Sequence, residues 1–95
     1  MSWDYRAKIL EIIVSVFKEN GNSPMWFSEI CASVQDIQRR FSTSRKIVSV
    51  LNNKRVFEVV QRSGPRRWGG LYRMREEVYE LSTDDIFAIA FRKNA

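Results

Sequence analysis

The basic side chains of this 95-residue chain are concentrated in one stretch of the sequence. Residues 38–75 carry eleven Lys or Arg against one acidic residue, Glu58, which gives the stretch a net charge of +10. The rest of the chain holds five basic and ten acidic residues, a net charge of −5. This segregation is typical of a polyanion-binding face on an otherwise solvated body, although stretches of sequence need not form patches in space.

Within the basic stretch, polar residues flank a short apolar stripe with helical spacing. Ile47, Val50 and Leu51 fall at i, i+3 and i+4, and they predict the buried face of a helix from the capping cluster 42–44 to about Asn53. Arg45 lies off this stripe, where its guanidinium can donate two hydrogen bonds to a guanine edge or remain a solvated charge. The other candidate contacts on this helix are Lys46, Ser49 and Asn53 along one face, with Thr43 and Ser44 in the first turn for a phosphate.

A second group of arginines surrounds a glycine-rich loop. Segments 56–62 and 71–75 are rich in β-branched and aromatic residues and predict two strands of a hairpin. The intervening segment 63–70 is longer than a usual hairpin loop, which favours a functional role such as contact with phosphates or a narrow minor groove. Trp68 either packs back on the hairpin or contacts the sugar-phosphate backbone. The candidate contacts are Arg62, Arg66, Arg67, Trp68 and Arg73 on the hairpin, with Arg39, Arg40 and Lys54 before it.

The N-terminal half predicts two further helices and a brief extended piece. The apolar spacing from Ile9 to Phe17 predicts a helix over 5–20, with Asp4 as its N-cap and Asn20-Gly21 as its stop. Residues 25–27 are expected to be extended, and Ser28 to cap a helix over 29–35. Three detailed expectations follow: Trp26 packs in the core or on the hairpin, Ile37 and Phe41 point inward, and Asn53 ends its helix in the left-handed conformation.

The C-terminal segment changes character. After Glu76 the chain becomes acidic, and Ser82 to Asp85 resembles the start of a helix over 82–93. This helix is strongly apolar, with Ile86, Phe87 and Phe91 among its residues. Because one short domain has little further core to offer, we expect these side chains to form a homodimer contact together with the first helix.

The order of helix, short strand, two helices, strand, basic loop and strand over residues 5–75 resembles the winged helix-turn-helix family, with 28–53 as the helix-turn-helix and 56–75 as the wing. The resemblance implies a single α+β domain over 1–95, with a three-helix core, a β-hairpin wing and an extra C-terminal helix. It also implies a transcription regulator that binds double-stranded DNA, with the helix at 44–53 in the major groove and the wing on the backbone or minor groove. The dimer would place two such helices about 34 Å apart.

Other kinds of binding stay open. Winged helices also serve as protein-interaction modules within larger assemblies. Lys46, Pro65 and Trp68 resemble winged helices that bind Z-form nucleic acid, but the paired prolines and helical tyrosine of that group are missing. RNA binding would need stacking aromatics, for which Trp68 is the main candidate.

Composition argues against catalysis. The chain has no His and one Cys, and it lacks a glycine-rich phosphate loop, so we expect no enzyme activity, metal site or small-molecule cofactor. Its start does not resemble a signal peptide, and it has no apolar run long enough to span a membrane. We therefore expect a cytoplasmic, nucleoid-associated protein without a membrane partner.

Overall fold

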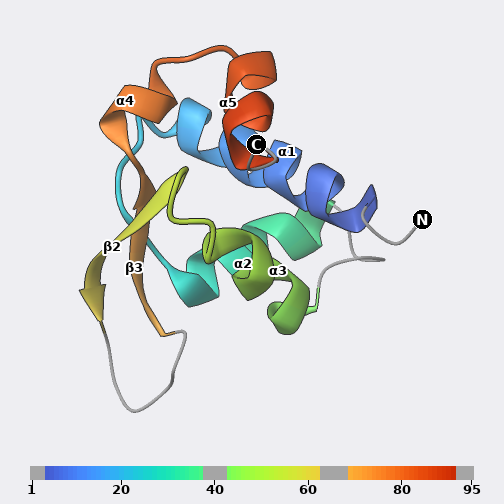
Figure 1. Ribbon diagram of the computed structural model, residues 1–95. Helices are drawn as coiled ribbons and strands as arrows, with labels where there is room; N and C mark the ends of the chain where they lie inside the picture. Colours follow the sequence, from blue (N-terminus) through green and yellow to red (C-terminus); the bar gives the residue numbers. More distant parts are fainter. Residues whose placement is uncertain (1–3, 38–42, 63–68, 92–95) are drawn as a thin grey trace.

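The computed structural model describes residues 4–37, 43–62 and 69–91, and its fold is α+β as predicted. Several helices pack with a small three-stranded antiparallel sheet (Figure 1). The elements in chain order are α1 (Asp4–Glu19), β1 (Met25–Trp26), α2 (Phe27–Ile37), α3 (Ser44–Leu51), β2 (Phe57–Arg62), β3 (Gly70–Met74), α4 (Glu76–Tyr79) and α5 (Thr83–Ala90).

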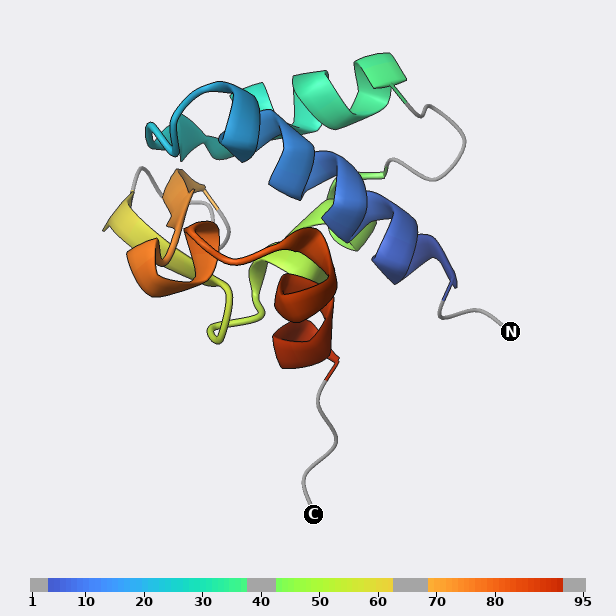
Figure 2. The same cartoon turned by 90° about the horizontal axis from the view of Figure 1, so that it is seen from above.

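Helix α1 is the central element of the helical part. Figures 1 and 2 both show it running between α2 and α5, and its buried stripe contains Ile9, Ile13 and Phe17. The helix begins at Asp4, so that residue is its first rather than the predicted cap before it. Gly21 has φ of +71°, which confirms the predicted left-handed stop after Asn20.

Helix α2 is longer than predicted at both ends, and Ser28 lies inside it rather than at its cap. A side-chain hydrogen bond at the N-terminus of α2 comes instead from Glu29, whose carboxylate accepts from the Trp26 backbone N–H at 2.8 Å. The burial prediction for Ile37 is wrong, because Ile37, in the last turn of the helix, is 60% exposed. Trp26 is 37% exposed and is not a core residue, but it lies on β1 opposite Leu71 of the hairpin strand β3, which is compatible with the predicted packing on the hairpin. Phe41 lies outside the described residues.

Helix α3 has the predicted core stripe, with Ile47, Val50 and Leu51 all buried. Thr43 is its N-cap, and the Thr43 hydroxyl accepts a hydrogen bond from the Lys46 backbone N–H at 3.2 Å. The helix ends at Leu51, two residues earlier than predicted, with Asn52 as a right-handed C-cap. Among the described residues, Asn22 is the one non-glycine residue with a positive φ. Asn53 therefore does not have the left-handed conformation that was predicted for it.

The sheet has β3 at its centre, in the order β1-β3-β2. The short strand predicted near Met25 is confirmed, and it pairs with β3 opposite Tyr72. The ladder between β2 and β3 shifts between Val59 and Gln61, which marks a bulge at Val60. A Cβ at Gly70 would lie 3.0 Å from the Gln61 carbonyl oxygen, so the close approach of β2 and β3 favours glycine at this position.

Two polar side chains of the α1 region join it to distant segments. The buried Asn22 side chain donates to the Met74 carbonyl at 2.9 Å and accepts from the Met74 N–H at 3.0 Å, in the manner of a neighbouring strand. The Lys18 ammonium donates to the carbonyl of Tyr79, the last residue of α4, and to that of Leu81, two residues beyond it. These contacts fix the sheet and α4 against α1.

The C-terminal segment belongs largely to the core of the single chain. Helix α5 begins as predicted, with the Ser82 hydroxyl accepting from the Asp85 N–H at 3.2 Å. Ile86 has no exposed surface, and Phe87 and Ile89 pack partly buried against the same core cluster. The expectation that one short domain has little further core for these side chains is therefore wrong for Ile86, and partly so for Phe87 and Ile89. The preceding α4 was not predicted, because its four residues are too few to show a helical period.

No helix within residues 4–37, 43–62 and 69–91 has the length and apolar character needed to cross a membrane.

Candidate nucleic-acid interface

The exposed face of α3 carries three hydrogen-bonding side chains. Arg45, Ser49 and Asn52 are all exposed and fall at i, i+4 and i+7, opposite the buried stripe. The Arg45 side chain makes no ion pair or hydrogen bond with another described residue. Asn52 was missing from the predicted site, although its position seven residues after Arg45 places it on the same face of a helix. Guanidinium, hydroxyl and carboxamide groups together can bond to guanine and adenine edges.

The face predicted from Lys46, Ser49 and Asn53 is different from the exposed one. Lys46 is half-buried, with its ammonium 4.9 Å from the centre of the Tyr5 ring on α1. The Asn53 amide donates to the Ala90 carbonyl at 2.9 Å and accepts from the Arg55 N–H at 3.1 Å. Asn53 therefore connects α3 to the end of α5, and only Ser49 of the three faces outward.

The first turn of α3 is also less open than expected. The Thr43 hydroxyl already caps the Lys46 N–H, so this donor is occupied. The Ser44 hydroxyl lies 4.0 Å from the Cys31 sulfur. Burial raises the pKa of the Cys31 thiol, and the Ser44 hydroxyl offsets this only in part, so the single cysteine stays a neutral thiol near neutral pH.

Among the described residues of the hairpin, one arginine has an exposed side chain without an ion-pair partner. Arg62 is exposed at the end of β2, and its charge partly offsets the raised pKa that burial gives the Tyr72 phenol. Arg73 is engaged, because its Nε lies 2.7 Å from the Glu58 carboxylate. Lys54 is exposed before β2, and its carbonyl accepts a bond from Arg75 at 2.6 Å. The predicted contacts Arg39, Arg40, Arg66, Arg67 and Trp68 lie outside the described residues.

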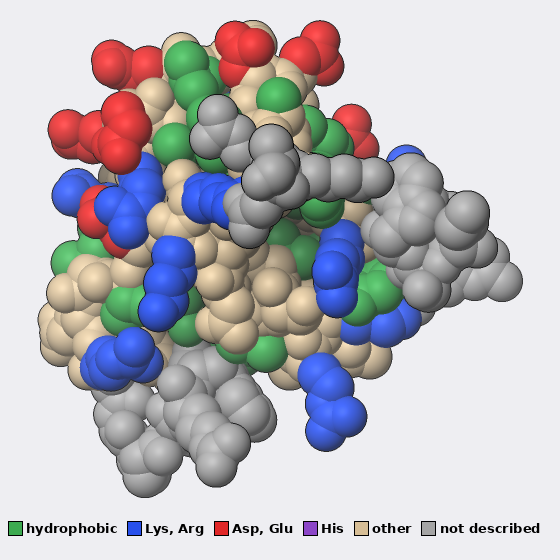
Figure 3. All heavy atoms as spheres, in the orientation of Figure 1, with side chains coloured by type: hydrophobic (Ala, Val, Ile, Leu, Met, Phe, Trp, Pro, Cys, Tyr) green, Lys and Arg blue, Asp and Glu red, His purple; other side chains and the backbone are tan. Residues whose placement is uncertain are grey.

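Charge is segregated in space as well as in sequence. Residues 76–91 contain five acidic and no basic residues, whereas the described residues of 43–75 contain seven basic residues and Glu58. Figure 3 shows the acidic side chains gathered at the α4–α5 end and the basic ones over the part that contains α3 and the strands. The acidic set consists of Glu76, Glu77, Glu80, Asp84 and Asp85. A polyanion would approach the α3 side and avoid the α4–α5 end.

The arrangement offers hydrogen-bonding groups and positive charge to a ligand. In the described part of the chain, no three His, Cys, Asp or Glu side chains lie close enough to hold a metal ion.

Comparison with known proteins gives one partial similarity. The chain is 34% identical over 92 residues to a ribulose bisphosphate carboxylase of Archaeoglobus fulgidus, a match that covers 93% of this chain and 19% of that protein. This chain thus spans about a fifth of the length of the curated relative it matches. No family model matches the chain, and no solved structure matches it significantly.

Proposed function

We propose that this chain binds double-stranded DNA as a winged helix-turn-helix domain, with α2 and α3 as the helix-turn-helix and β2–β3 as the wing. The observation that carries the proposal is the outward face of α3, where Arg45, Ser49 and Asn52 are exposed together. The separation of charge supports it, because the acidic side chains lie away from this helix (Figure 3). The element order and the antiparallel hairpin are compatible with it.

In this proposal α3 enters the major groove and reads base edges. Arg45, in the first turn, donates two hydrogen bonds to a guanine, and Asn52, about two helical turns further along, pairs with an adenine. Ser49 lies between them and accepts or donates as the base requires. Arg62 and Lys54 contact phosphates beside the groove, and these contacts fix orientation without reading sequence.

The proposal extends to a role for this chain as a homodimeric transcription regulator. Two copies would place their α3 helices in successive major grooves, about 34 Å apart. Helix α5 can supply less of the dimer contact than expected, because Ile86 is inside the core of its own chain. Phe91 remains 44% exposed at the end of α5, and it is the main apolar side chain that α5 leaves for a partner copy.

Protein interaction is the second candidate, favoured by one specific observation. Val59 and Val60 are exposed on β2, which is an edge strand of the sheet. An unpaired edge can accept a strand from a partner protein. The basic side chains of α3 have no role in this alternative.

Selection of bound duplexes from a random library tests the proposal directly. A DNA-reading α3 predicts enrichment of a common site, and a two-fold symmetric site would support the dimer. The same selection is repeated with the Arg45→Ala chain, whose enriched sites should lose the preference at one base pair. Recovery of no enriched site, together with no retention on random duplex at low salt, would contradict DNA binding and leave the edge strand as the better candidate.

A further inference from the structure

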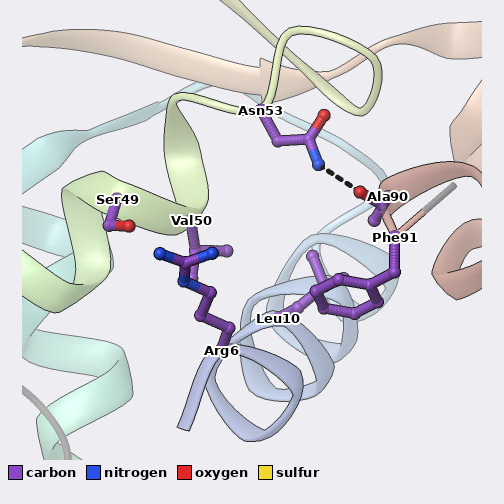
Figure 4. Close-up of a pocket in the computed structure, with 7 residues that line it drawn as sticks. All are labelled: Arg6, Leu10, Ser49, Val50, Asn53, Ala90 and Phe91. Carbon is purple, nitrogen blue, oxygen red and sulfur yellow. Dashed lines mark hydrogen bonds between the residues drawn. The ribbon is translucent and has the colours of Figure 1, made fainter. Parts of the chain in front are cut away.

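A half-open pocket of about 110 Å³ lies between α1, α3 and α5. Figure 4 shows its walls, which bring together residues from the beginning, the middle and the end of the described chain. Four of its seven lining residues are apolar and three are polar. The pocket therefore has two kinds of wall, which restrict what it can hold.

The polar wall contains a cation without a carboxylate partner. Arg6 is exposed, and it forms no ion pair with any described residue. In Figure 4 its guanidinium extends from α1 toward Val50 and Ser49 of α3. Asn53 completes this side and is held in place by its bonds to Ala90 and Arg55. A fixed amide, a hydroxyl and a guanidinium around one space suit an oxyanion.

The apolar wall lies beside it. Leu10, Val50 and Ala90 contribute aliphatic surface, and the Phe91 ring borders the pocket near Leu10 (Figure 4). Phe91 is 44% exposed, so apolar surface at the rim is left in contact with water. A ligand that covered this ring would remove that surface from water, which is favourable.

We propose that this pocket binds a small carboxylate with an apolar body. The carboxylate would form a two-bond pair with Arg6 and contact Ser49, while the apolar body would lie against Leu10 and Phe91. A water molecule occupies roughly 30 Å³ in the liquid, so the space suits a group of a few heavy atoms, with the rest of the ligand in the open mouth. Inorganic phosphate has no apolar part and would leave the Phe91 wall uncovered.

The position of the pocket gives the ligand a regulatory effect, which rests on the proposed function. Ser49 lines the pocket and also belongs to the exposed face of α3. A carboxylate bound there places a negative charge beside a helix that would approach phosphates, so it would weaken DNA binding. Binding of the carboxylate can be tested on the protein without DNA, so its outcome is separate from that of the proposed DNA binding.

The test titrates the full chain with sodium benzoate and follows backbone amide signals by two-dimensional NMR at constant ionic strength. Saturable shifts confined to the residues that line the pocket on α1, α3 and α5 are expected. Benzyl alcohol, which has the same ring without the charge, should bind more weakly, and inorganic phosphate should give no saturable shift there. Equal responses to benzoate and phosphate, or shifts spread over all basic residues, would overturn the proposal.

Two substitutions with the same change in charge separate the pocket from general electrostatics. Arg6→Gln should weaken benzoate binding by about tenfold or more, because a charge-assisted pair is lost. Lys8→Gln, at an exposed position of α1 that does not line the pocket, should leave it unchanged. Thermal unfolding of both chains verifies that each is folded. Equal weakening by both substitutions would contradict a built site, whatever the outcome of the DNA experiments.

Discussion

The α3 and β-hairpin side of the molecule and its α4–α5 end differ in what their side chains do. On α3 the polar side chains Arg45, Ser49 and Asn52 are exposed. At the other end the acidic side chains are exposed as well, but Ile86 of α5 is fully buried, and Lys18 binds the carbonyls of Tyr79 and Leu81 between α4 and α5. The comparison teaches that the acidic end contributes stability, whereas the basic side has side chains free for a partner.

The largest expected effect comes from removing core volume at the acidic end. Ile86→Ala should lower the free energy of unfolding by about 2–5 kcal/mol, because it deletes a fully buried side chain. Chemical denaturation measures this loss. DNA affinity of the folded fraction should stay the same. An unchanged unfolding midpoint would mean that α5 is not part of the core, and that it is available for a dimer contact as the sequence suggested.

The next effect belongs to the basic side. Arg45→Ala should cost about 1–3 kcal/mol of binding free energy on the preferred duplex and leave the stability of the fold within about 0.5 kcal/mol. Fluorescence anisotropy on preferred and random duplexes measures the difference. Lys8→Ala, which removes one charge from an exposed position of α1, is the control. If both substitutions weakened the two duplexes equally, Arg45 would contribute charge alone.

Two adjacent asparagines sharpen the comparison further. Asn53→Ala removes the bonds to Ala90 and Arg55, so it should destabilise the fold by about 1–3 kcal/mol. Asn52→Ala removes an exposed side chain from α3, so it should weaken DNA binding and leave stability nearly unchanged. Both chains are measured by denaturation and by anisotropy. If Asn53→Ala weakened DNA binding and Asn52→Ala lowered stability, the face predicted from the sequence, through Lys46, Ser49 and Asn53, would be the correct one.

The smallest effect is expected from neutralising the acidic end. Glu76→Gln combined with Glu77→Gln should strengthen DNA binding by less than about twofold at physiological salt, because screening limits exposed charges at a distance. Competition between the two chains for one labelled duplex measures so small a change. A large gain would show that the acidic end lies close to the bound DNA.

The sequence predicted the elements better than their contacts. The stripe of α3, the two strands of the hairpin and the start of α5 follow from local periodicity and capping, and all three are confirmed. The role of Asn53 and the burial of Ile86 depend on how α5 packs against α1 and α3, which periodicity does not encode.

The candidate site was predictable to a similar degree. Arg45 and Ser49 lie on the outward face of α3 as expected, because the opposite face was clear from its apolar spacing. The partners of Lys46 and Arg73 could not be predicted. They come from α1 and from the neighbouring strand, and only the folded chain brings them together.

The dependence of DNA binding on salt tests the central claim most directly. If the basic side of the chain neutralises about six phosphates, the logarithm of the association constant should fall against the logarithm of salt concentration with a slope near −5. Anisotropy titrations of a random duplex at several salt concentrations give this slope. Association that does not change with salt, or no association at low salt, would contradict the claim that this face binds DNA.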